Sequence, residues 1–213
     1  VDKPLFLIGH DMLVLDGELK YEIMTITSDF VIIDGVQFRN SGSSSYEDIA
    51  ALRIMQSGHI LVRNNTFNRT FFGIYCQHAY SSTIYNNRFQ SNAIDETTSA
   101  NGIHCWKSEN MLIINNEISG HRDGIYFEFV TGSMIKGNKS HNNARYGLHF
   151  MFSHDNEFRH NEFRDNGAGV AVMYSRGVTM TQNLFADNWG SAAYGILMKD
   201  ITDSKVEGNQ FRR

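Results

Sequence analysis

Two methionines, a histidine and a glutamate recur at regular intervals in the second half of the chain and could form a metal site. His149 and Met151 are two residues apart, Met173 follows Met151 by 22 residues, and Glu128 precedes it by 23. Thioether and imidazole ligands suit Cu(I), whereas oxygen-rich sites suit Ca²⁺ or Mg²⁺. We therefore predict a transient Cu(I) site formed by His149, Met151 and Met173. Glu128 would orient His149 or add an oxygen ligand.

Aromatic side chains near these residues suggest a second use of the same region. We expect His104, Trp106 and Tyr126 to bound a docking surface for another protein, because solenoids bind partners along extended faces. Exposed methionines have no solvation reason to be present. Two alternatives to the metal site therefore stay open: a loop covers Met151 and Met173, or they form a hydrophobic docking strip without metal.

An enzyme acting on carbohydrate would need paired carboxylates in a groove lined with aromatic residues. Glu128 is the one carboxylate that we place on this face, and no partner acid occupies the same positions in adjacent repeats. Asp95 and Asp123 are placed at a variable corner and could approach only by loop folding. We therefore expect no enzymatic activity, and a carbohydrate-binding or carbohydrate-active protein is the alternative.

All these residues belong to an internal repeat. An asparagine follows each glycine–aliphatic pair after 14 residues, seven times out of seven, whereas the return to the next glycine takes 8 to 15 residues. Solenoids behave in this way, with sides of fixed length and one corner that accepts insertions. The base period is 22 residues, and we expect long corners at residues 40–50, 90–101 and 186–194. The glycines are Gly73, Gly102, Gly124, Gly147, Gly169 and Gly195, with Ala51 in the first copy, and the asparagines are Asn65, Asn87, Asn116, Asn138, Asn161, Asn183 and Asn209.

Apolar residues alternate within each repeat, which predicts three short strands with one inward face. The result is an all-β, right-handed parallel β-helix of about eight coils over residues 1–213, a single domain that we expect to be a fragment of a longer chain. Inward columns should run from Leu52 to Ile196, Ile54 to Met198, Val62 to Val206 and Phe67 to Phe211. The outward columns of the first strand are Arg53, Tyr75, His104, Tyr126, His149, Ala171, Leu197 and Met55, Gln77, Trp106, Glu128, Met151, Met173, Lys199.

Asparagine at a turn tolerates left-handed dihedrals, and its amide can bond to the equivalent amide one coil away. We expect the asparagine column to have both features. The glycine column should mark a bend. Cys76 and Cys105 share an inward column, and three interpretations stay open: core residues, a disulfide between coils, or a functional thiol. We expect the single histidines near turns to be solvated; these are His10, His59, His121 and His141.

Composition excludes several classes of function. The formal net charge is −4 and the basic residues are scattered, which argues against nucleic-acid binding. The sequence contains no run of eighteen apolar residues, which is the length that a transmembrane helix needs. We also see no signal peptide at the start of the sequence.

Four specific stretches resemble the NosD family, a group of periplasmic β-helical accessory proteins. They are Gly102–Trp106, Arg122–Glu128, Tyr146–Ser153 and Val172–Ser175, and the opening coils are also similar to the family. The resemblance covers nearly the whole chain, although the chain is shorter than expected of the family. It implies delivery of copper to nitrous oxide reductase during maturation of its copper centre. It also implies two further partners: an ABC transporter, through its membrane and ATPase subunits, and a copper-carrying lipoprotein.

Overall fold

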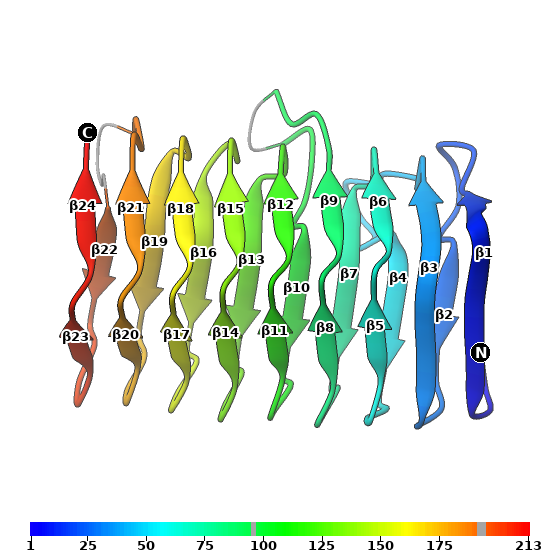
Figure 1. Cartoon of the computed structure of the whole chain (residues 1–213), viewed down its shortest axis with the longest axis horizontal. Coiled ribbons are helices and arrows are strands. Elements are labelled where there is room, and N and C mark those ends of the chain that lie inside the picture. Colours follow the sequence, from blue (N-terminus) through cyan, green and yellow to red (C-terminus); the bar gives the residue numbers. More distant parts are fainter. Residues whose placement is uncertain (95–96, 191–194) are drawn as a thin grey trace.

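The computed structural model describes residues 1–94, 97–190 and 195–213, and over these residues the chain forms short parallel strands without a helix. The strands lie in three rows along the molecule, and a typical coil adds one strand to each (Figure 1). The described residues make about nine turns, close to the eight predicted, and confirm the parallel β-helix. None of them belongs to a helix that could cross a membrane.

The first row is a sheet of eight strands: β2 (Met24–Ile26), β4 (Ala50–Met55), β7 (Phe72–Gln77), β10 (Ile103–Trp106), β13 (Asp123–Glu128), β16 (Tyr146–Met151), β19 (Ala168–Met173) and β22 (Ile196–Lys199). The other two rows join into one sheet because the long strand β3 (Val31–Arg39) pairs with both of them, and β1 (Leu5–Asp16) pairs with β3.

The second row continues with β5 (Leu61–Arg63), β8 (Thr83–Tyr85), β11 (Leu112–Ile114), β14 (Met134–Lys136), β17 (Glu157–Arg159), β20 (Thr179–Thr181) and β23 (Lys205–Glu207). The third row continues with β6 (Thr66–Asn68), β9 (Arg88–Gln90), β12 (Glu117–Ser119), β15 (Lys139–His141), β18 (Glu162–Arg164), β21 (Leu184–Ala186) and β24 (Gln210–Arg212).

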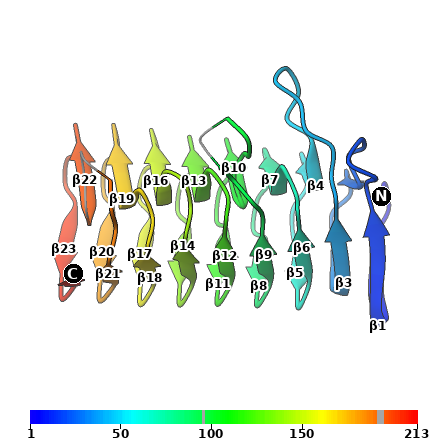
Figure 2. The same cartoon turned by 90° about the horizontal axis from the view of Figure 1, so that it is seen from above.

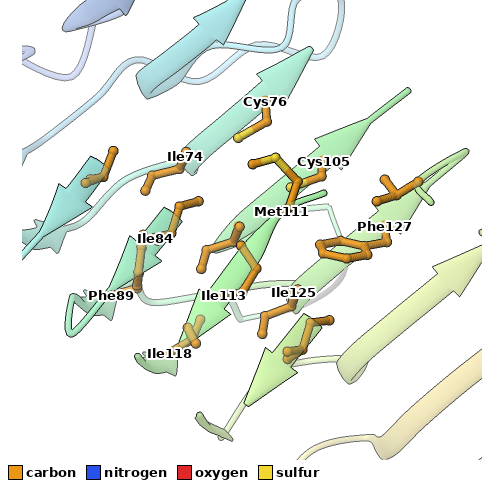
Figure 3. Close-up of a cluster of buried hydrophobic side chains, with 14 of the residues drawn as sticks. Ile74, Cys76, Ile84, Phe89, Cys105, Met111, Ile113, Ile118, Ile125 and Phe127 are labelled. Carbon is orange, nitrogen blue, oxygen red and sulfur yellow. The ribbon is translucent and has the colours of Figure 1, made fainter. Parts of the chain in front are cut away.

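Equivalent residues of successive coils pair with one another, as predicted. Ile103, for example, pairs with Ile74 on one side and Ile125 on the other. The predicted inward columns are buried from their first members through the coil that contains β19, and Figure 3 shows part of this core around Cys76 and Cys105. In the last described coil, Met198, Val206 and Phe211 are about half exposed because no described coil stacks on them, whereas Ile196 is partly buried.

An asparagine ladder runs along the corner between the second and third rows. From Asn65 to Asn209, each amide Nδ2 donates to the Oδ1 of the next asparagine at 3.0 Å. The same oxygens also accept backbone N–H groups of the preceding coil. The amide bonds are confirmed, but the left-handed dihedral lies one residue earlier than predicted, for example at Asn64 and Asn86. The ladder residues therefore contribute through their side-chain hydrogen bonds and not through a left-handed backbone.

The glycine column marks a close approach inside the first row; the predicted bend was wrong. Gly73 lies within β7, and its φ is not positive. A Cβ at this position would lie 2.4 Å from the carbonyl oxygen of Gly102 and 2.6 Å from the ring of Phe89. Glycine therefore lets the first row pack directly against the phenylalanine column of the third row.

The long corners connect the third row to the first. Residues 40–49 lie between β3 and β4, and residues 91–102 lie between β9 and β10; both corners project from the same side of the molecule (Figure 2). The third corner, residues 187–195, precedes β22. Residues 95–96 and 191–194 of these corners lie outside the described residues. The predicted positions are confirmed for the remainder.

The ladder predicts a specific stability cost. Asn116 donates to Asn138 and to the carbonyl of Ile84, and accepts two hydrogen bonds from Asn87. We expect Asn116→Ala to lower the free energy of unfolding by roughly 2–3 kcal/mol, because buried partners lose their bonds. The exposed Asn92→Ala control should change it by less than about 0.5 kcal/mol. Equal urea midpoints for the two variants would contradict a structural role of the ladder.

Candidate functional site

A column of stacked rings covers the outward face of the first row. Ring centroids are 4.6 Å apart for Tyr75 and His104, 4.7 Å for His104 and Tyr126, and 4.6 Å for Tyr126 and His149. Strand pairing puts these residues in the predicted register. Although they point outward, Tyr75, His104 and His149 are only 5%, 7% and 4% exposed.

Residues at the beginnings of the first-row strands help to cover this column. The ring of Tyr146 packs against His149 at 4.9 Å, and the carboxylate of Asp123 lies 3.7 Å from His149 Nδ1. The placement of Asp123 at a corner was wrong, because this residue begins β13 and is fully buried. A strand that begins before the glycine brings the acid onto the sheet without any loop folding.

Asp123 is the centre of a buried charge network. Arg145 donates to its two carboxylate oxygens, from Nε at 2.9 Å and from Nη2 at 2.5 Å. Burial by itself would raise the pKa of Asp123, but the hydrogen bonds and charges of Arg145 and His149 outweigh it and lower the pKa to about 2. Asp123 therefore remains ionised near neutral pH and holds Arg145 and His149 in place.

Hydrogen bonds define the proton position on His104. Arg122 Nη2 donates to Asn101 Oδ1 at 3.3 Å, which leaves the Asn101 amide nitrogen facing His104 Nδ1 at 3.3 Å. Nδ1 is thus the acceptor, and the proton of the neutral ring is on Nε2. This Nε2 has no hydrogen-bond partner within the described residues. Burial, followed by the charge of Arg122, lowers the pKa of His104 to about 3, so the ring is neutral near pH 7.

The second outward column contains the predicted metal ligands other than His149. Glu128 pairs with Met151, Met151 pairs with Met173, and all three side chains are half-buried. Histidine, cysteine and carboxylate side chains alone form no group of three that could hold a metal in the described part of the chain. A metal site here would therefore depend on the thioethers. The ligand set of His149, Met151, Met173 and Glu128 stays a prediction.

A third column, which the sequence analysis missed, lies next to the methionines at the corner between the first and second rows. Phe129, Phe152 and Tyr174 stack at centroid distances of 5.2 and 5.1 Å. All three have left-handed backbone dihedrals, with φ of 55°, 49° and 51°. This conformation costs about 1–2 kcal/mol for an L-residue. The recurrence of aromatic residues directly after Glu128, Met151 and Met173 was the available signal.

Residues 43–48 of the first long corner and residues 97–100 of the second border a cleft of about 1160 Å³ over the first row. The predicted docking residues His104, Trp106 and Tyr126 line its floor together with Glu128, whereas His149, Met151 and Met173 lie outside the lining. Burial raises the pKa of Glu128; the charge of His149 acts in the opposite direction, and the negative charge of Asp48 from the first corner makes a smaller contribution that also raises it. A second acid therefore does act on Glu128. The sequence analysis considered Asp95, which lies outside the described residues, and Asp123, but not Asp48.

Two other sequence expectations are resolved by burial. Cys76 and Cys105 are free, buried and paired in adjacent strands, so the structure favours their interpretation as core residues. Burial, followed by the neighbouring Cys76, raises the pKa of the Cys105 thiol.

His10 and His59 are exposed and His141 is partly exposed. The solvated placement of His121 was wrong, because it is fully buried with its Nδ1 3.4 Å from the hydroxyl of Ser99 in the second long corner.

Removing the carboxylate of Asp123 should destabilise the site. We expect Asp123→Asn to lower the free energy of unfolding by roughly 2 kcal/mol at pH 7. The folded-state pKa of about 2 lies below the ordinary value of 3.8, so this contribution is present above about pH 4 and is lost as the pH falls toward 2. Urea unfolding of both proteins at pH 7 and pH 3 would measure it. A difference that grows on acidification would contradict the network.

Comparisons with known proteins agree with this architecture. The family described as "Periplasmic copper-binding protein (NosD)" matches residues 90–213. A Pseudomonas aeruginosa protein named "Probable ABC transporter binding protein NosD" is 31% identical over 126 residues, which are 58% of this chain and 29% of that protein. The chain thus spans less than a third of the length of this curated relative.

Solved structures with a similar fold include carbohydrate-active proteins. A mutant of the periplasmic alginate epimerase AlgG has a TM-score of 0.63 at 13% identity, covering 81% of this chain and 50% of that chain. A mutant of DFA-IIIase from Arthrobacter chlorophenolicus, in complex with DFA-III, has a TM-score of 0.59 at 12% identity, covering 97% and 57%. At such identities the likeness shows the fold alone. The family match, in contrast, extends over more than half of the sequence, and the chain belongs to the NosD family of periplasmic copper-binding proteins.

Proposed function

We propose that this chain handles copper in the periplasm and acts as a docking scaffold during maturation of the copper centre of nitrous oxide reductase. The observation that carries the proposal is the pairing of Met151 with Met173 on adjacent strands, where both side chains face outward. Membership of a copper-binding family supports it. Copper is cargo in this proposal, bound and passed on, and the chain itself catalyses no reaction.

The methionine pair has the chemistry that Cu(I) requires. Paired residues on neighbouring strands are about 4.8 Å apart, and long, flexible thioethers at that spacing can converge on one ion. His149 precedes Met151 by two residues on β16, and its Nε2 has no hydrogen-bond partner within the described residues. Asp123, at 3.7 Å from Nδ1, favours a fixed imidazole orientation. Glu128 lies on the other side of Met151 and could add an oxygen ligand.

The cleft supports the docking part of the proposal. Its floor carries His104, Trp106 and Tyr126, and it opens on the same face as the methionine pair. We assign it to protein partners: nitrous oxide reductase, the subunits of an ABC transporter and a copper-carrying lipoprotein. The name of the Pseudomonas aeruginosa relative supports the transporter among these partners.

Carbohydrate chemistry is the competing function, and one observation favours it. Glu128 and Asp48 both line a cleft that also contains Trp106 and Tyr126. Carboxylate pairs and aromatic rings are the groups used by glycosidases. Release of sugar fragments from a polysaccharide by the purified chain would decide for this alternative.

Replacement of the two methionines tests the copper site. Met151→Leu with Met173→Leu preserves volume and hydrophobicity and removes sulfur, so we expect at least tenfold weaker Cu(I) retention under reducing conditions. The matched control is Met55→Leu with Met134→Leu. Met55 occupies the same outward column but pairs with Gln77, and Met134 lies on the second row. If Cu(I) affinity and maturation of the reductase both survive the first pair of substitutions, the site is absent and the strip serves docking alone.

Substitutions that introduce charge or bulk into the cleft test docking separately from copper binding. We expect Trp106→Arg and Tyr126→Arg to reduce pull-down of nitrous oxide reductase, because both side chains line the cleft floor. The exposed Tyr85→Arg variant, on the second row, provides the control. Unchanged association in both cleft variants would count against this surface.

A further inference from the structure

The charge of the cleft identifies the kind of ligand that it fits. Glu47 and Asp48 from the first long corner line it together with Glu128 from the floor. Over the described part of the chain, none of these three carboxylates takes part in an ion pair. Arg122 is the one cationic side chain among the described lining residues, and it already bonds to Asn101. The cleft therefore disfavours anions and attracts cations.

The carboxylates that line the cleft differ in exposure. Glu47 and Asp48 are exposed, whereas Glu128 on the floor is half-buried. All three attract a bound cation, whereas a neutral ligand gains nothing from their charge.

The aromatic floor is suited to the same ligands. The guanidinium of Arg53 lies over the ring of Tyr75 at 5.1 Å, and the ammonium of Lys107 lies over the ring of Trp106 at 4.5 Å. Both rings line the cleft. The chain's own cations thus show that these rings accept guanidinium and ammonium groups, which are attracted to the negative faces of aromatic rings.

A buried donor adds a second requirement. His104 lines the cleft at 7% exposure, and its Nε2–H has no hydrogen-bond partner among the described residues. A buried donor without a partner costs about 1–3 kcal/mol, so a ligand that supplies an acceptor there gains affinity. The ligand should therefore combine cationic groups with an acceptor such as a peptide carbonyl oxygen.

The size and rim of the cleft are consistent with a polypeptide. Its volume of about 1160 Å³ exceeds the roughly 300–1,000 Å³ of most small-molecule pockets. Tyr46, at the tip of the first corner, also lines the cleft and is 97% exposed. Exposed tyrosines are enriched where proteins bind one another.

We propose that this cleft binds an extended, arginine- or lysine-bearing segment of a partner protein. The carboxylates of Glu47, Asp48 and Glu128 pair with its cationic side chains, Trp106 and Tyr126 pack against them, and His104 donates to a backbone carbonyl. This assignment deepens the docking role proposed above and rests on that role, and it shares only Glu128 with the proposed copper ligands.

The probe is a fluorescent tetra-arginine peptide, titrated into the copper-free chain at low salt and followed by anisotropy. We expect saturable binding that weakens as salt is raised. Glu47→Gln with Asp48→Asn should weaken binding by about tenfold, since two charge pairs and the cation–π contacts that they support are affected. The control, Glu157→Gln with Glu162→Gln, removes the same charge from the second and third rows and should leave affinity unchanged. Circular dichroism melts establish that each variant is folded.

Several outcomes would overturn the assignment. They are no binding of tetra-arginine at low salt, equal weakening by both pairs of substitutions, and equally tight binding of tetra-glutamate. Binding of cellotetraose in place of the cationic peptide would assign the cleft to glycans instead. Met151→Leu with Met173→Leu should retain peptide binding while losing Cu(I), so failure of the copper site and failure of the cationic cleft are distinguishable.

Discussion

Backbone hydrogen bonding between coils is the constraint on which the rest of the structure depends. It holds neighbouring coils about 4.8 Å apart, so each residue stacks on its equivalent in the next coil. Few kinds of side chain benefit from stacking on themselves at this distance. Amides bond head to tail, as from Asn65 to Asn87, and rings stack, as between Phe67 and Phe89 at 4.5 Å. The same constraint pairs Met151 with Met173 on the outer face.

This constraint explains why much of the fold could be predicted. A solenoid repeats a short local pattern, so the 14-residue interval between glycine and asparagine was enough to align the seven coils from Ala51 to Asn209. Once aligned, the columns of the first row followed by counting, and the pairing of His104 with Tyr126 and of Met151 with Met173 is as predicted. Insertions could also be located, because only the corner between the third and first rows varies in length.

Counting could not predict which outward residues are covered. The alternation of a strand says that His149 points away from the core, but Tyr146 and Asp123 from the same sheet pack against it. His121 is buried for a related reason, since it lies against Ser99 of an inserted corner whose path has no repeat to follow. The left-handed backbone position was also predicted one residue too late: the residue with positive φ is Asn64, while Asn65 supplies the ladder amide.

Glu128 connects the two parts of the outer face. It lines the cleft on one side, and on the other it pairs in register with Met151, which in turn pairs with Met173. A carboxylate that bonds to a cation in the cleft is less able to contact a metal at the methionine pair. If both sites are occupied as proposed, thermodynamic linkage requires that docking and copper affinity change one another by the same factor. Shared use of one carboxylate is thus a physical route by which partner binding could loosen a copper ion bound at the proposed site.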